Sequence, residues 1–186
     1  MNEHRLHRLV IQVTQIVFAV SVISGCGYTA RSMISDKYRT IYIAPFANKT
    51  DITREADAAN KYKLYRPMLE SDITREVINK YLFDGNLKPG KEESADLTLR
   101  GELTDFRKDP VRYDENDNVS EYRVNMVVNL TLWDNKADKQ EWQESGFTGE
   151  STYFTSGTQV KSEGTAINEA ITDLARRIVE GTVEQW

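Results

Sequence analysis

The residues able to do specialised chemistry are few, and they lie near the start of the chain. Both histidines, His4 and His7, fall within the first 25 residues, and the single cysteine is Cys26. If those 25 residues are removed, no histidine remains. This loss excludes the Ser-His-Asp and Cys-His triads and the usual zinc sites from the rest of the chain. Cys26 is therefore the residue whose chemistry has to be explained first.

The segment before Cys26 has the parts of a secretory signal. Arg5 and Arg8 make a positive start, and Leu9 to Val22 is an apolar run interrupted by a few polar residues. The run is too short and too polar to span a hydrocarbon core of about 30 Å, which needs about 20 apolar residues. We therefore predict that residues 1–25 are a signal peptide that the working protein lacks.

The end of this segment, Ile23-Ser24-Gly25-Cys26, resembles a lipobox, the recognition sequence of bacterial lipoprotein signal peptidase. The resemblance implies cleavage before Cys26 and lipid on its sulfur and its amine. Acyl chains on the sulfur remove the liability of a lone thiol in an oxidising periplasm, and two or more chains anchor a protein stably. Gly27 in place of Asp implies sorting to the outer membrane. The alternative is an ordinary thiol after a plain signal peptide.

Composition narrows the function of the 161 residues that remain of the 186. Residues 1–25 hold two Arg and one Glu, so 22 of 24 basic and 28 of 29 acidic residues remain, a net charge of −6. This balance predicts no nucleic-acid partner. No acidic pair is singled out by its setting, so we expect no catalytic activity and no bound metal or cofactor. A carboxylate-dependent enzyme acting on cell-wall glycans is the alternative.

The chain after Cys26 divides into a polar tether, residues 26–38, and one domain, residues 39–186. Arg39 to Phe46 reads as a strand that Pro45 ends. Pro67 opens a helix that stops at Gly85. Its apolar positions recur about once per turn, at Leu69, Ile73, Val77, Ile78, Tyr81 and Leu82.

Three strands and a second helix follow. Alternation starts at Leu97, and a polar stretch from Lys108 to Ser120 reads as a long hairpin loop. Tyr122 to Trp133 alternates without a break, and Gln140 to Tyr153 is a weaker strand in which glycines suggest a bulge. The last helix runs from about Gly164 to Val183. Its apolar stripe consists of Ala166, Ile167, Ala170, Ile171, Leu174, Ile178 and Val179.

This order predicts an α+β fold. Three consecutive strands with short links favour antiparallel pairing, and two one-sided helices can cover one face of a sheet. We therefore expect a two-layer sandwich, with a sheet of about four mostly antiparallel strands and two helices on one face.

Several short motifs, none specific alone, occur in an order typical of one family. They are Cys26-Gly27-Tyr28, Tyr42 to Thr50 (YIAPFANKT), Leu69-Glu70, Ile73-Thr74, Phe83-Asp84-Gly85, Ala95 to Leu103 (ADLTLRGEL) and an Ala/Ile-rich helix closing on Trp186. Together they resemble the LptE family, the lipopolysaccharide-assembly lipoproteins of the outer membrane. One departure is a longer insert, from about Asp51 to Leu64, between the first strand and the first helix.

The resemblance implies a binding role on the periplasmic side of the outer membrane. Members of the family plug a large β-barrel of the LptD type, and together the two proteins place lipopolysaccharide in the outer leaflet. The interior of such a barrel is polar, which fits the polar strand positions Asn125, Asn129 and Thr131. The alternative partner is another outer-membrane secretion complex, in which the protein would bind a different barrel or form a ring.

Lipopolysaccharide carries phosphates, which are bound by Arg and Lys side chains. Two groups of basic residues are candidates, and we predict that they bind this glycolipid. They are Arg107, Lys108 and Arg112 near the end of the second strand, and Lys136 and Lys139 at the turn after the third. The competing interpretation is ordinary solubilising charge, because Asp105, Asp109 and Asp114 dilute the first group.

Overall fold

The computed structural model describes residues 37–50 and 63–184. The predicted signal peptide, Cys26, most of the predicted tether and residues 51–62 of the predicted insert lie outside the described residues. The elements, in chain order, are β1 (Thr40–Ile43), β2 (Ala47–Asn48), α2 (Leu69–Asp84), β3 (Lys88–Pro89), a 3-10 helix (Glu92–Ser94), β4 (Leu97–Tyr113), β5 (Val119–Asp134), β6 (Lys139–Phe154) and α3 (Glu163–Glu184).

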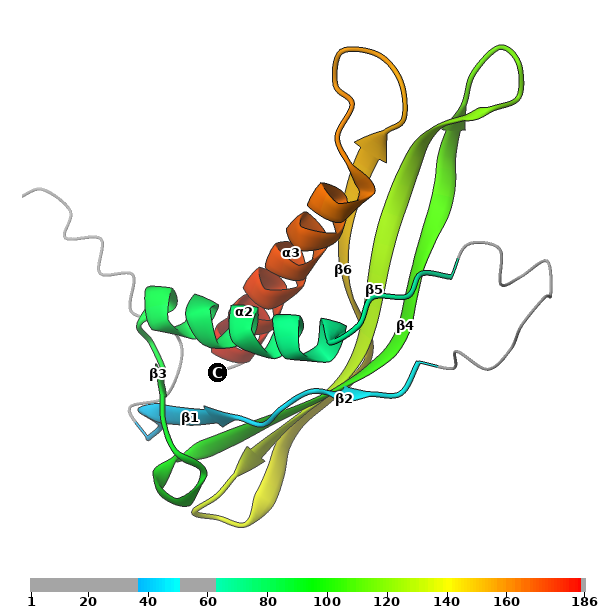
Figure 1. Cartoon of the computed structure of the whole chain (residues 1–186). Coiled ribbons are helices and arrows are strands. Elements are labelled where there is room, and N and C mark those ends of the chain that lie inside the picture. Colours follow the sequence, from blue (N-terminus) through cyan, green and yellow to red (C-terminus); the bar gives the residue numbers. More distant parts are fainter. Residues whose placement is uncertain (1–36, 51–62, 185–186) are drawn as a thin grey trace, which may run out of the picture. The chain divides into compact units, whose positions relative to one another are not determined.

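The sheet is mixed and has six strands, which corrects the predicted four-stranded sheet (Figure 1). Its order is β3-β1-β4-β5-β6, with β2 also pairing with β4. The strands β4, β5 and β6 are antiparallel, as predicted, but β1 runs parallel to β4 with Ile41 beside Leu97. Two parallel neighbouring strands need a crossover connection, and α2 lies within the connection between β1 and β4.

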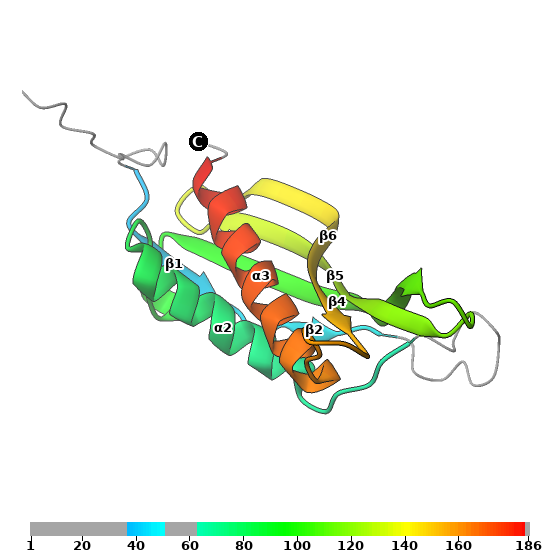
Figure 2. The same cartoon turned by 90° about the horizontal axis from the view of Figure 1, so that it is seen from above.

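Both helices cover one face of the sheet, as predicted, which gives two layers (Figure 2). The buried stripe of α2 is Leu69, Ile73, Val77 and Tyr81. Leu82, which we expected on this stripe, is 63% exposed. The hydroxyl of Tyr81 lies 2.5 Å from that of Thr182, so the ends of the two helices are joined. Gly85, with φ 78°, ends α2 as the sequence predicted.

The core follows the predicted alternation of β5. Val124, Met126, Val128, Leu130 and Leu132 are all buried against the helices. Every residue of the predicted stripe of α3 is also buried. Residues at the alternate positions of β5 lie on the face that the helices leave uncovered.

The β4–β5 hairpin is longer than expected, because β4 continues to Tyr113 and β5 begins at Val119. The predicted loop from Lys108 to Ser120 is therefore wrong for most of its length. Pro110 lies within β4 opposite Tyr122. Beyond Arg107 the described part of β4 pairs only with β5, so proline occupies an edge position where its missing N–H breaks no ladder.

Two glycines in β6 have different roles. Gly146, with φ 73°, lies at a register shift between β5 and β6, which confirms the predicted bulge. Gly149 instead allows close packing, because a Cβ there would lie 2.7 Å from the Cα of Leu174. This glycine lets α3 approach the sheet.

Candidate functional site

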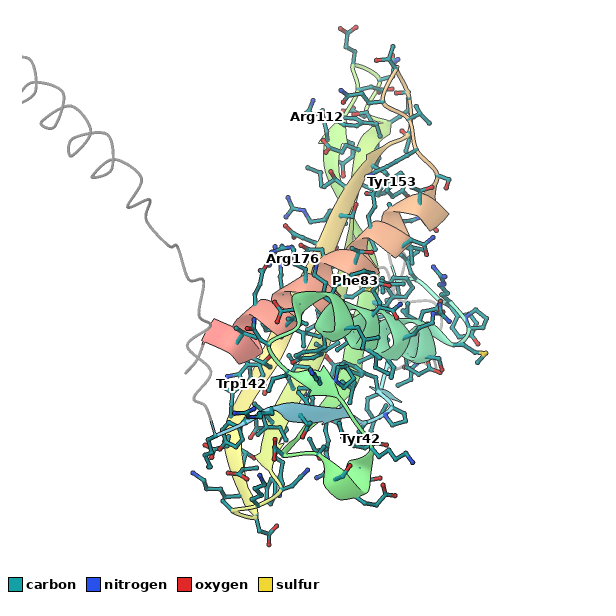
Figure 3. The ribbon with its side chains drawn as sticks, turned by 90° about the vertical axis from the view of Figure 1, so that its left-hand side faces the viewer. Tyr42, Phe83, Arg112, Trp142, Tyr153 and Arg176 are labelled. Carbon is teal, nitrogen blue, oxygen red and sulfur yellow. The ribbon has the colours of Figure 1, made fainter. Side chains whose placement is uncertain are left out.

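The two predicted groups of basic residues lie at opposite ends of the long strands. Lys108 pairs with Val124 of β5, whereas Lys139 pairs with Asp134. The ten steps along β5 from Val124 to Asp134 span about 33 Å at the usual rise of a strand. Figure 3 shows Arg112 toward one end of the molecule and Tyr42 toward the other. The two groups cannot contact one phosphate together.

Arg107 lies on the uncovered face of the sheet and is neutralised there. Its guanidinium pairs with Asp105, and its Nε lies 3.2 Å from Oδ2 of Asp109. Asn125 is buried beside it and donates to Asp109 at 2.6 Å, so this residue does not belong to a solvated surface. Burial alone would lower the pKa of Arg107, but the two carboxylates raise it.

Lys108, one residue further on, points to the helix-covered face. It pairs with Glu163, the first residue of α3, and Tyr153 donates its hydroxyl to the same carboxylate oxygen at 2.9 Å. Tyr153 also stacks on Tyr122, with 5.6 Å between ring centroids. Burial opposes ionisation of Glu163, but Lys108 and Tyr153 lower its pKa. Lys108 therefore fastens the start of α3 to the sheet.

Arg112 is the most exposed of this group, with 66% of its side chain accessible. Its Nε lies 3.5 Å from Glu121, and its guanidinium lies 5.7 Å from the centroid of the Phe154 ring. Val111 and Tyr113 are its neighbours on β4, and both have exposed apolar side chains. Val160, which is also exposed, forms an isolated β-bridge with Phe154 after the end of β6. We call Arg112 and these three residues the hairpin tip.

Lys136 and Lys139 also have carboxylate partners. Lys136 lies 2.6 Å from Asp96, and Lys139 lies 2.9 Å from Glu141. Burial would raise the pKa of Asp96, but Lys136 and the amides of Arg39 and Thr40 lower it to about 2. All five predicted residues thus lie within 4 Å of an acidic partner.

The residues that organise this second end were not predicted from the sequence. Asp134 is fully buried and accepts hydrogen bonds from Lys37 and from the hydroxyl of Tyr38, at 2.6 Å and 2.8 Å. The same hydroxyl oxygen also lies 2.8 Å from Oε1 of Glu141, so the two carboxylates share its one proton. Burial opposes the charge of Asp134, but these donors and two backbone amides lower its pKa. An acidic residue at the end of an apolar strand was the only signal in the sequence.

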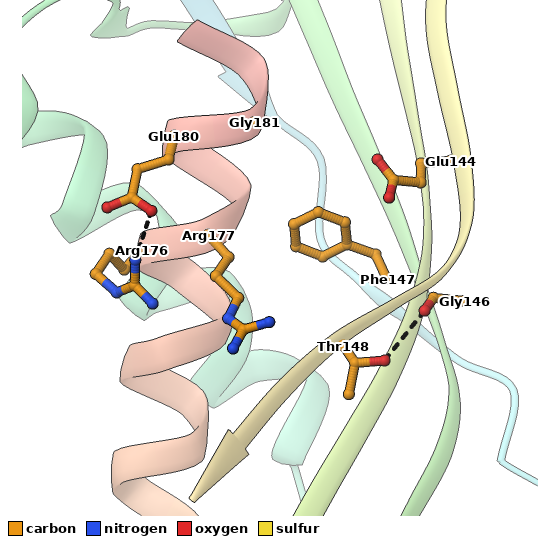
Figure 4. Close-up of a pocket in the computed structure, with 8 residues that line it drawn as sticks. All are labelled: Glu144, Gly146, Phe147, Thr148, Arg176, Arg177, Glu180 and Gly181. Carbon is orange, nitrogen blue, oxygen red and sulfur yellow. Dashed lines mark hydrogen bonds and ion pairs between the residues drawn. The ribbon is translucent and has the colours of Figure 1, made fainter. Parts of the chain in front are cut away.

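A cavity of about 590 Å³ lies between β6 and α3 (Figure 4). Phe147 and Gly146 contribute one wall, and Arg176 and Arg177 the other. Both guanidiniums pair with Asp173, at 2.6 Å and 2.9 Å, and Arg176 also pairs with Glu180. The cavity is therefore polar, and both of its guanidiniums have carboxylate partners within the protein.

Two other kinds of site were tested. Across residues 37–50 and 63–184, no group of three His, Cys, Asp or Glu side chains is placed to hold a metal ion. In the same ranges no helix is long and apolar enough to cross a membrane.

The fold is one that occurs in known bacterial proteins. Protein XCC0632 from Xanthomonas campestris is similar at a TM-score of 0.54 and 12% identity, covering 78% of this chain and 84% of that one. A minor lipoprotein from Acinetobacter baumannii is similar at a TM-score of 0.51 and 16% identity, covering 80% and 94%. At these identities the likeness shows the fold alone.

The sequence defines the family. The family model LptE, described as lipopolysaccharide-assembly, matches residues 38–180. The chain therefore belongs to the LptE family, as its motifs indicated. No curated protein sequence matches it.

Proposed function

We propose that the protein is a lipoprotein of the outer membrane, anchored through Cys26 on the periplasmic side, that plugs a β-barrel of the LptD type and assists lipopolysaccharide transport. The observation that carries this proposal is the family match over residues 38–180, which includes every described strand, all of α2 and most of α3. The proposed role is binding, and no bond is made or broken by this chain.

The uncovered face of the sheet supports the barrel partner. Arg100 lies opposite Thr131, and Glu102 opposite Asn129, in the ladder between β4 and β5. Arg100 and Glu102 are exposed, and the other two are partly exposed. A polar face of this kind can exchange its water for hydrogen bonds to the polar interior of a barrel.

The hairpin tip supports lipopolysaccharide as the ligand. This glycolipid presents phosphates beside acyl chains, so its site must combine cations with apolar surface. Arg112 supplies an exposed guanidinium near the Phe154 ring, and Val111, Tyr113 and Val160 are the exposed apolar residues of the same tip. Arg107 and Lys108 lie on opposite faces of β4, so their proposed phosphate contacts are separate, and each residue makes its contact only by giving up its carboxylate partner. Lys136 and Lys139, about 33 Å away along the strands, make a separate proposed contact.

The proposal is tested by a gentle detergent pull-down of the tagged, lipidated protein from its own outer membrane, followed by mass spectrometry. We expect one large barrel in nearly equal amount. Recovery of only further copies of this chain, or of secretion proteins, would defeat the proposal and favour a secretion complex. An identically tagged protein with Cys26→Ser separates barrel binding from membrane co-purification.

A further inference from the structure

The last turn of α2 exposes two adjacent apolar side chains. Leu82 is 63% and Phe83 is 87% exposed, and Phe83 is the most exposed large apolar residue of the described chain. The turn is held rigidly, because Gly85 donates its N–H to Tyr81 at 3.1 Å and Tyr81 is fixed to Thr182 of α3. The exposure is therefore a property of the packed fold.

This turn lies at the end of the domain where the chain arrives from Cys26. The strand β3 follows α2 after three residues, and Lys88 of β3 pairs with Thr40 of β1. Figures 1 and 2 agree that the end of α2 lies beside the start of β1. The five steps along the chain from Phe83 to Lys88 span at most about 18 Å, so the exposed pair lies close to the start of the domain.

The chain is also fastened at this end. Lys37 and Tyr38 are bound to Asp134, so the domain begins at a fixed point. The 11 residues from Cys26 to Lys37 can reach at most about 40 Å when fully extended. A lipid on Cys26 therefore limits the distance between this end of the domain and the membrane surface to about 40 Å, which leaves Leu82 and Phe83 able to reach the membrane.

Two exposed basic residues also lie at this end of the domain. Arg39 and Lys88 are exposed and adjacent, with the N–H of Lys88 donating to the carbonyl of Arg39 at 2.9 Å. Neither makes an ion pair in the part of the chain that the structure describes. The one acidic residue within the turn, Asp84, is hydrogen-bonded to Asn86 at 2.8 Å. Exposed apolar residues flanked by Arg and Lys are typical of segments that lie on anionic lipid.

We propose that Leu82 and Phe83, together with Arg39 and Lys88, form a second membrane contact that lies on the phospholipid leaflet holding the lipid of Cys26. This inference rests on the proposed lipidation. Because two or more acyl chains already anchor a protein stably, the contact sets the orientation of the domain on the membrane rather than its affinity. It directs the hairpin tip, at the other end of β4, away from the leaflet.

The test is to measure the immersion of a spin label. Phe83→Cys is labelled in the full lipidated protein, in which Cys26 is occupied, and is reconstituted in vesicles of phosphatidylethanolamine and phosphatidylglycerol. We expect the label at position 83 to collide with oxygen and to be several-fold less accessible to a water-soluble nickel complex than the same label in Tyr113→Cys. Equal nickel accessibility at the two positions would overturn the inference.

Further variants separate the possible failures. In Asn86→Cys, labelled beside the contact, adding Leu82→Ser and Phe83→Ser should restore nickel accessibility, and retained protection would contradict the inference. Vesicle flotation and the mass of the N-terminal peptide report lipidation independently, so an anchored protein with a solvated label at 83 defeats this contact alone. Protection that appears only when the barrel is added would assign the contact to a protein and also overturn it.

Discussion

Tyr38 donates its hydroxyl to Oδ2 of Asp134 at 2.8 Å and so joins the first described residues to the β5–β6 turn, 96 positions away. Asp134 is fully buried, and its other oxygen accepts the amides of Lys136 and Ala137. One carboxylate thus shapes the turn and fixes the start of the domain.

Asp134→Asn should lower the free energy of unfolding by about 1.5–3 kcal/mol, the scale of hydrogen bonds to a charged group. The amide keeps the size of the side chain but cannot accept at both positions. Tyr38→Phe should cost less, about 1 kcal/mol, because Lys37 still pairs with Asp134. Urea unfolding at pH 7 measures both. Tyr113→Phe, at the exposed hairpin tip, is the control, and equal midpoints for all three variants would contradict the role of Asp134.

Acid should weaken the fold partly through Asp96. The pKa of this carboxyl is about 2 in the folded protein and about 3.9 in the unfolded chain, so the folded state favours its charged form. A lowered pKa contributes stability that is present above about pH 4 and is lost as the pH falls toward 2. Asp96→Asn should therefore lose less stability between pH 6 and pH 3 than the parent protein. Asp117→Asn, in the exposed hairpin turn, should keep the parent's pH dependence.

Gly149→Ala should destabilise the protein by about 1–3 kcal/mol through overpacking. The added Cβ would meet the Cα and backbone nitrogen of Leu174 at 2.7 Å and 2.8 Å, so α3 would have to move from the sheet. Gly90→Ala is the matched control, because its Cβ would meet only Thr40, at 3.9 Å. Thermal unfolding of both variants tests the difference, and a Gly149→Ala protein as stable as the control would contradict the proposed close packing.

The elements with strong periodicity were predictable. Apolar residues recur at every second position from Tyr122 to Trp133, and about once per helical turn in α3. Each of these two periods identifies both the type of element and its buried face. The parallel pairing of β1 with β4 was not predictable, since a strand–helix–strand order allows several arrangements. β3 has only two residues, Lys88 and Pro89, and carries no pattern.

The candidate site was predictable in residue type but not in pairing. The ion-pair partner of Lys108 is Glu163, 55 positions away in the sequence, and the partner of Lys136 is Asp96, 40 positions away. Such partners depend on the register of β4 and on where α3 lies, which local sequence does not specify. The exposure of Leu82 shows the same limit, because helical spacing alone placed it on the buried stripe.

Arg112→Glu should weaken lipopolysaccharide binding about tenfold and change the free energy of unfolding by less than about 0.5 kcal/mol. The guanidinium is mostly exposed and its contact with Glu121 is long, so the fold loses little, whereas a phosphate loses a charge-assisted hydrogen bond and meets a repelling carboxylate. Binding is measured by titrating the detergent-solubilised protein with labelled lipopolysaccharide, and stability by urea unfolding. Arg100→Glu, twelve positions earlier on the same strand and therefore far from the hairpin tip, is the control with an equal change of charge. Lys108→Met should instead lower stability, because it leaves Glu163 without its cation. If Arg112→Glu binds as the parent protein does while Lys136→Glu with Lys139→Glu loses binding, the glycolipid contact lies at the β5–β6 turn.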